Sequence, residues 1–187
     1  MSKRIIVGIS GASGIVYGVR ALQLLGECGV ETHLVMSKSA ELTLHYEMDL
    51  SVDEVKALAH EVYPVKNVGA AIASGSFITS GMLVAPCSIR SMGEIATGVT
   101  STLLTRAADV VLKERRRLVL MLRETPLHTG HLRTMTALSE MGAVIAPPVP
   151  AFYSRPQSLD EMVTQSVGRV LDLFDLEIPQ VKRWQDE

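Results

Sequence analysis

The sequence predicts an α/β fold: a single Rossmann-like (flavodoxin-like) domain with a parallel sheet and helices on both faces. Five short apolar runs alternate with segments of helical periodicity along the 187-residue chain. Continuous apolar runs are typical of strands that are buried on both faces, and strand–helix alternation favours parallel strands joined by right-handed crossovers. The length suits one domain with a full core, so we expect residues 1–187 to form a single domain.

The predicted strands are short runs of mostly aliphatic residues: Ile5–Ile9, Thr32–Met36, Met82–Ala85, Leu118–Leu122 and Ala143–Ala146. Helices are expected between and after them, over Ile15–Leu25, around Leu42–Tyr46, from near Val52, over Ile89–Ala96, over Leu103–Lys113, near Leu132–Met141 and from Ser158 to about Phe174. Capping-box spacing marks two of these helix starts. Residues 64–81 lack periodicity, which predicts a loop. A tail of about residues 175–187 holds Trp184, the only tryptophan.

Composition excludes several classes of protein. The formal net charge is −2 and no large basic cluster is present, which argues against nucleic-acid binding. No apolar run approaches the roughly 20 residues of a membrane span, and the first is too short for a signal peptide. Cys28 and Cys87 have neither disulfide nor zinc-site spacing, so we expect a cytoplasmic protein. The histidines are scattered without a carboxylate cluster, so no metal site is expected.

The first strand ends in a glycine-rich turn. Gly8, Gly11 and Gly14 are spaced three apart, with Ser10 and Ser13 between them. Because ligands of such sheets bind beyond the carboxyl ends of the strands, this turn is a candidate anion site. The spacing is not that of the dinucleotide fingerprint, and a plain strand-to-helix turn is the alternative.

The next two strand exits are also polar. The second strand ends at Ser37, where a nicotinamide-dinucleotide site usually carries an acidic residue, so a smaller mononucleotide or a simple helix cap fits better. Residues 86–91 follow the third strand and could form a second anion nest. Cys87 in this segment is better explained by packing than by nucleophilic chemistry.

The last two exits carry charge and aromatic rings. Arg123 and Glu124 could hold a phosphate and transfer a proton, or form a loop ion pair of little consequence. The proline-rich segment 147–156 contains Phe152 and Tyr153 and is either a stiff loop over a pocket or a loop packed on the core. The residues alone therefore predict an α/β protein that binds a phosphorylated ligand.

At these exits the sequence resembles the flavin prenyltransferase family (UbiX/Pad1-like), over Ile5 to Trp184. The resemblance rests on a combination of motifs: Gly11-Ala12-Ser13-Gly14, Met36-Ser37-Lys38, Ser74-Gly75-Ser76, Pro86-Cys87-Ser88, Arg106-Ala107-Ala108-Asp109-Val110, Arg123-Glu124 and Pro150-Ala151-Phe152-Tyr153. The chain departs from its relatives at Ser91-Met92, where Thr-Leu is frequent, and at Leu122, where some have proline. Neither departure removes a site residue.

The resemblance implies a metal-independent enzyme that joins a dimethylallyl group from dimethylallyl phosphate to N5 and C6 of reduced FMN. The product, prenylated FMN, would serve a UbiD-type decarboxylase in ubiquinone biosynthesis or aromatic-acid decarboxylation. Members of the family assemble as homododecamers. The tail would then contact a neighbouring subunit.

Site residues carried over by position fall into three groups. FMN would contact Gly11, Ala12, Ser13, Ser37, Ser88, Ile89, Arg90, Ser91 and Arg123. Dimethylallyl phosphate would contact Arg106, Lys113, Tyr153, Arg169 and Trp184. Proton transfer would involve Ser13, Glu47 and Glu124. Fixed cations would stabilise the departing phosphate, and aromatic faces would stabilise allylic cation character.

Three other functions compete with this interpretation. An FMN-dependent cysteine decarboxylase shares the fold and the flavin site but does not need the phosphate-binding cations. A non-catalytic flavin carrier needs the FMN contacts but not the two glutamates. A nicotinamide dehydrogenase is disfavoured by Ser37 and by the glycine spacing.

Overall fold

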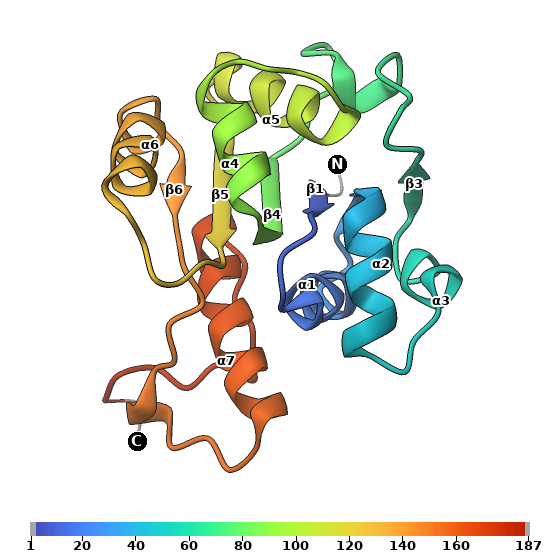
Figure 1. Ribbon diagram of the computed structural model, residues 1–187. Coiled ribbons are helices and arrows are strands. Elements are labelled where there is room, and N and C mark those ends of the chain that lie inside the picture. Colours follow the sequence, from blue (N-terminus) through green and yellow to red (C-terminus); the bar gives the residue numbers. More distant parts are fainter. Residues whose placement is uncertain (1–2, 186–187) are drawn as a thin grey trace.

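The strands form one parallel sheet, in the order β3-β2-β1-β4-β5-β6 (Figure 1). The computed structural model describes residues 3–185. The strands are β1 (Arg4–Ile9), β2 (Glu31–Met36), β3 (Glu61–Tyr63), β4 (Gly81–Cys87), β5 (Arg117–Leu122) and β6 (Val144–Ile145). The predicted α/β class, with a parallel sheet, is therefore confirmed.

The five predicted strands are present, and the structure adds a sixth. This is β3, a three-residue edge strand that pairs with β2 and is only partly buried. An edge strand of this length needs no apolar run, because one side of it faces solvent and only one neighbour supplies hydrogen bonds. For this reason the sequence pattern did not reveal it. β6 is shorter than predicted and covers two residues.

The helices lie close to their predicted positions. They are α1 (Ile15–Glu27), α2 (Lys38–Glu47), α3 (Val52–Lys56), α4 (Ile89–Ala96), α5 (Leu103–Lys113), α6 (Thr129–Glu140) and α7 (Leu159–Leu171). Short 3₁₀ turns, η1 (Ala71–Ala73), η2 (Phe152–Ser154) and η3 (Asp172–Phe174), complete the described elements. A hydroxyl side chain accepts a backbone N–H at the start of α2, α3, α4, α5 and α7, which satisfies one of the amides that a helix start leaves unpaired.

Helices cover both faces of the sheet because side chains alternate along each strand. Ile5, Val7 and Ile9 of β1 face the core that α1 and α7 cover. Ile6 of β1, with Met82 on β4, faces the core under α4 and α5. In a doubly covered parallel sheet, the strand ends and their loops are left to form a ligand site.

The C-terminal part extends away from the sheet. After β6, residues 147–158 lead to α7, which packs on α1, and residues 175–185 return along α7. In Figure 1 this part lies at the opposite end of the molecule from α5. Within residues 3–185, no helix combines the length and the apolar character that crossing a bilayer requires.

Candidate functional site

The carboxyl ends of β1 and β4 are joined by a buried serine. Ser10, only 1% exposed, donates its hydroxyl proton to the Pro86 carbonyl oxygen (2.9 Å) and accepts the Ser88 backbone N–H (2.7 Å). The strand order reverses between β1 and β4, and open α/β sheets bind ligands at such a point. Ser10 thus fixes the two turns that carry most of the predicted flavin contacts.

The glycine-rich turn after β1 is tightly packed. A Cβ on Gly11 would lie 2.3 Å from the Ser39 side chain at the start of α2, so only glycine fits there. Gly14 has a φ of 99°, a left-handed conformation that glycine adopts without strain. Ala12 and Ser13 lie between them, and the Ser13 side chain is exposed. The turn therefore presents Ser13 to solvent at the start of α1.

The amino end of α1 already has an acidic partner. The Oε2 atom of Glu47, the last residue of α2, accepts the backbone N–H of Gly14 (2.8 Å) and of Ile15 (3.0 Å). A carboxylate here satisfies free amides and complements the helix dipole. The anion site expected at this helix start is thus occupied by a side chain of the same chain, and Glu47 lies beside Ser13.

One cavity joins three of the strand exits. It measures about 390 Å³ and is lined by Ser13, Gly14, Val16, Tyr17, Leu122, Arg123, Glu124, Thr125, Pro147, Pro148 and Val149. Ser13, Arg123 and Glu124, which come from distant parts of the sequence, therefore line the same cavity. Arg123 is held close to β4, because its backbone N–H donates to the Cys87 carbonyl oxygen (3.1 Å).

Tyr17 in this cavity was not among the predicted site residues. Burial raises the pKa of its phenol, and the nearby positive charge of Arg123 partly offsets the rise. The side chain therefore stays protonated at neutral pH and presents an aromatic ring to the cavity. Tyr17 is the third residue of α1 and lies three positions after Gly14. An aromatic residue so close to a glycine-rich strand exit is the sequence feature that could have marked it as a site residue.

The remaining predicted flavin contacts begin helices. Ser37 is the N-cap of α2 and accepts the Ala40 N–H (3.0 Å), which confirms the capping alternative for this residue. Ser88 is the N-cap of α4, with its hydroxyl bonded to the backbone N–H and the hydroxyl of Ser91 (3.2 Å each). These hydroxyls line the turns after β2 and β4.

The residues next to Ser88, which are Cys87, Ile89 and Arg90, differ in burial and in their contacts. Ile89 is half-buried. Arg90 is exposed and pairs with Glu94 one turn along α4 (2.9 Å), which holds its guanidinium on the helix surface. Burial raises the pKa of the Cys87 thiol to about 12, and this side chain is fully buried, as a packing role requires.

The predicted contacts of dimethylallyl phosphate form a second group in the C-terminal part. The rings of Tyr153 and Trp184 meet edge to face, with centroids 5.5 Å apart, beside a cavity of about 410 Å³. Arg169 pairs with Asp172, which also receives two hydrogen bonds from Arg183 (2.8 and 2.9 Å). None of these residues lines the cavity that contains Ser13 and Arg123.

Arg106 and Lys113 form a third group, on α5. Arg106 pairs with Asp109 (2.8 Å), and Lys113 pairs with Glu114. Lys113 ends α5 shortly before β5 begins at Arg117, so it lies at the amino-terminal edge of the sheet, opposite the strand exits. A single chain therefore does not bring the three groups of predicted residues together.

A family model, curated sequences and solved structures that resemble this chain all describe flavoproteins. The flavoprotein family model matches residues 1–172. The flavin prenyltransferase UbiX of Escherichia coli K12 is 59% identical over 186 residues, covering 98% of both chains. A crystal structure of AnUbiX (PadA1) in complex with FMN and dimethylallyl pyrophosphate is 48% identical, covers 100% of both chains and superposes with a TM-score of 0.98. A dodecameric FMN-dependent UbiX-like decarboxylase from Escherichia coli O157:H7 is 50% identical, covers 98% of this chain and 100% of that one, and gives a TM-score of 0.95.

Proposed function

Because the chain belongs to the flavoprotein family and, within it, to the flavin prenyltransferases, we propose that it joins a dimethylallyl group to N5 and C6 of reduced FMN, with dimethylallyl phosphate as the donor. The single observation that carries this proposal is the cavity that gathers Ser13, Arg123 and Glu124 from two strand exits. A cation, a hydroxyl and a carboxylate that converge on one cavity are the groups that phosphate departure and proton transfer require.

The residues present fit a flavin mononucleotide. Arg123 and the hydroxyls at the starts of α2 and α4 offer donors to an anionic phosphate and to ring oxygens. Tyr17, Leu122 and the two prolines after β6 offer an apolar wall to a planar ring. Reduced FMN supplies the electron-rich nitrogen and carbon that accept the prenyl group.

The chain's own residues have separate tasks in this reaction. When the C–O bond of dimethylallyl phosphate breaks, the electron pair leaves on the phosphate, so fixed cations lower the barrier. Bonding at N5 would release the N5 proton, whereas ring closure at C6 would add one proton to the prenyl double bond and release the proton of C6. Glu124 and Ser13 line the cavity, where they could accept and return these protons. Glu47, beside Ser13, would complete a proton relay.

The dimethylallyl phosphate site would be shared between subunits. Tyr153, Trp184 and Arg169 belong to the C-terminal part, while Arg106 and Lys113 belong to α5. Figure 1 shows these two parts at opposite ends of the molecule. A related structure is a dodecamer. We therefore infer a homododecamer in which the C-terminal part of one subunit meets the flavin cavity of another. The predicted tail contact of about residues 175–187 would belong to this interface, and the last two of these residues lie outside the described ones.

The product needs a protein that uses prenylated FMN, for which we propose a UbiD-type decarboxylase.

A cytoplasmic location is supported by the two free cysteines, Cys28 exposed and Cys87 buried, which suit a reducing compartment.

The test is to incubate the protein anaerobically with reduced FMN and dimethylallyl phosphate and to measure the mass of the flavin. We expect a gain equal to one C₅H₈ unit. An unchanged flavin mass, with loss of CO₂ from a peptide ending in cysteine, would instead identify the cysteine decarboxylase activity. FMN that binds tightly but changes in neither assay would indicate a carrier.

A further inference from the structure

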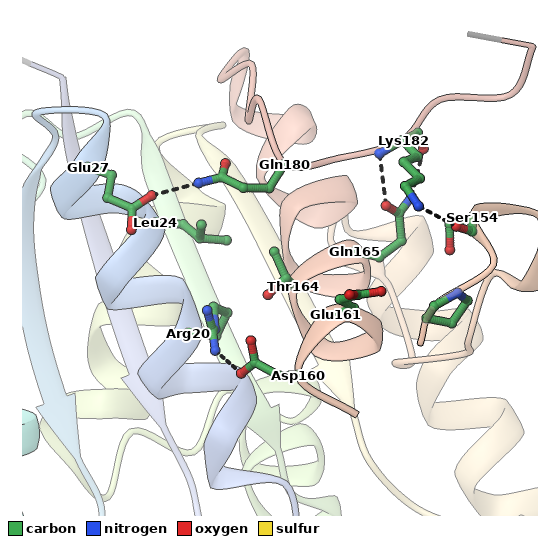
Figure 2. Close-up of a pocket in the computed structure, with 11 residues that line it drawn as sticks. Arg20, Leu24, Glu27, Ser154, Asp160, Glu161, Thr164, Gln165, Gln180 and Lys182 are labelled. Atoms are coloured by element: carbon green, nitrogen blue, oxygen red, sulfur yellow. Dashed lines mark hydrogen bonds and ion pairs between the residues drawn. The ribbon is translucent and has the colours of Figure 1, made fainter. Parts of the chain in front are cut away.

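Two residues on one face of α7 fix the path of the tail. Gln165 is 4% exposed, and its side-chain amide makes two hydrogen bonds to one tail residue: Nε2 donates to the Lys182 carbonyl oxygen (2.8 Å) and Oε1 accepts the Lys182 N–H (2.9 Å). Figure 2 shows Gln165 pointing from α7 toward Lys182. One buried amide thus satisfies both backbone groups of Lys182 and sets the register of the tail against the helix.

Gly168 gives the tail room to approach. It lies three residues after Gln165 and therefore on the same face of α7. A Cβ at Gly168 would lie 2.2 Å from Cγ2 of Val181, whose side chain is buried. Val181 can pack this closely against the helix only because residue 168 has no side chain.

The fixed tail organises the residues around it. Lys182 Nζ donates to the Ser154 carbonyl oxygen (3.0 Å), which links the tail to η2, the turn that contains Tyr153. Gln180 donates to Glu27 on α1 (2.9 Å), as Figure 2 also shows. Two residues beyond the Gln165 contact, Trp184 meets the ring of Tyr153. The position of this aromatic pair therefore depends on where the backbone of Lys182 is held.

We propose that Gln165 and Gly168 are positioning residues: they dock the tail on α7 and thereby set the Tyr153–Trp184 pair that receives dimethylallyl phosphate. This proposal rests on the proposed function. Neither residue lines the cavity of Ser13 and Arg123, so they act on the affinity for dimethylallyl phosphate and not on FMN binding.

The first variant is Gln165→Met, which keeps the length of the side chain and removes both hydrogen bonds. We expect the KM for dimethylallyl phosphate to rise about tenfold, the free-energy equivalent of one or two buried hydrogen bonds, with the Kd for FMN within about twofold of wild type. Amide exchange in a peptide containing Lys182 should accelerate, and the anisotropy of the only tryptophan should fall. Gln23→Met on α1, outside both cavities, is the matched control and should behave as wild type.

The second experiment tests the close approach of Val181 to Gly168. Gly168→Ala favours the helix by propensity but places a methyl group against Val181. It should raise the KM and the exchange rate as Gln165→Met does. Gly168→Ala combined with Val181→Ala removes the clashing atom and should recover most of both losses.

Two results would overturn the proposal. One is a Gln165→Met enzyme with wild-type exchange at Lys182 and an unchanged KM. The other, which also decides the matter if Gln165→Met fails to fold, is a double variant that recovers nothing. Failure of the proposed function is separate: the wild-type protein would leave the flavin mass unchanged, while exchange and anisotropy would still report tail docking.

Discussion

At the scale of single residues, the two glutamates assigned to proton transfer are held very differently. Glu47 accepts two backbone N–H groups at the start of α1, so its carboxylate has a fixed structural task. Within residues 3–185, Glu124 accepts only the N–H of the next residue (3.0 Å), and it lines the cavity with Ser13 and Arg123. Glu124 is therefore better placed to exchange protons with a bound ligand.

This difference predicts that Glu124→Gln keeps FMN affinity but slows prenylation about 100-fold, because an amide replaces the proton-transferring carboxylate without changing its shape. Single-turnover mass spectrometry of the flavin would measure the rate. Glu140→Gln, an exposed change on α6, is the control. A normal rate in Glu124→Gln would rule out its role in proton transfer.

At the scale of elements, sequence periodicity predicted five strands and all the long helices because buried parallel strands and amphipathic helices have distinct patterns. It missed β3, which lies at a sheet edge. The glycine turn, Arg123 and Glu124 could be placed near one another from the sequence, since the strand exits share one edge of the sheet; their roles in the site stay predictions. The roles of Ser10 and Tyr17 were not predicted, because a hydrogen bond across two loops and a cavity wall depend on three-dimensional contacts.

The hydrogen bonds of Ser10 predict a stability effect at the junction of β1 and β4. Ser10→Ala leaves the Ser88 N–H without its hydroxyl acceptor and should lower the free energy of unfolding by about 1–3 kcal/mol. Urea denaturation would measure this. Ser76 is exposed and, in the part of the chain that the structure describes, bonds only to Ser74, so Ser76→Ala should change stability little. Equal stabilities would mean that the junction does not depend on the Ser10 hydroxyl.

His33 on β2 predicts that the stability of the fold depends on pH. Burial lowers the pKa of His33, although the hydrogen bond to Glu31 opposes the shift. Below the usual histidine pKa of about 6.5 the unfolded chain binds a proton that the folded chain does not, so stability is present above that pH and is lost as pH falls. In urea unfolding at pH 7.5 and 5.5, His33→Gln should lose less stability than wild type. An equal loss would show that His33 does not contribute.

At the scale of the whole molecule, the proposed active site is incomplete in one chain. The cavity of Ser13 and Arg123 belongs to the sheet, whereas Tyr153 and Trp184 belong to the C-terminal part. No sequence pattern reveals this division, since sequence spacing does not tell which residues meet within a chain and which meet between copies. Assembly would then be a condition for activity.

Mixing two inactive variants tests this division. Arg123→Ala subunits and Arg169→Ala subunits should each be inactive as pure assemblies. After dissociation and reassembly together, some sites would combine an intact sheet cavity with an intact C-terminal part, and we expect a substantial fraction of wild-type flavin prenylation to return. Reassembly of each variant alone is the control. Mixed assemblies without activity would place the whole site within one chain.

The Glu47 carboxylate at the start of α1 also limits how this scaffold could evolve or be redesigned. A diphosphate brought to the first turn would meet a resident negative charge from α2. Changing the spacing of Gly8, Gly11 and Gly14 to that of a dinucleotide-binding loop would therefore not be enough to create a nicotinamide-dependent enzyme. Glu47 would have to be replaced as well. The first turn of α1 is thus closed by a residue of a second helix, 33 positions from Gly14 in the sequence.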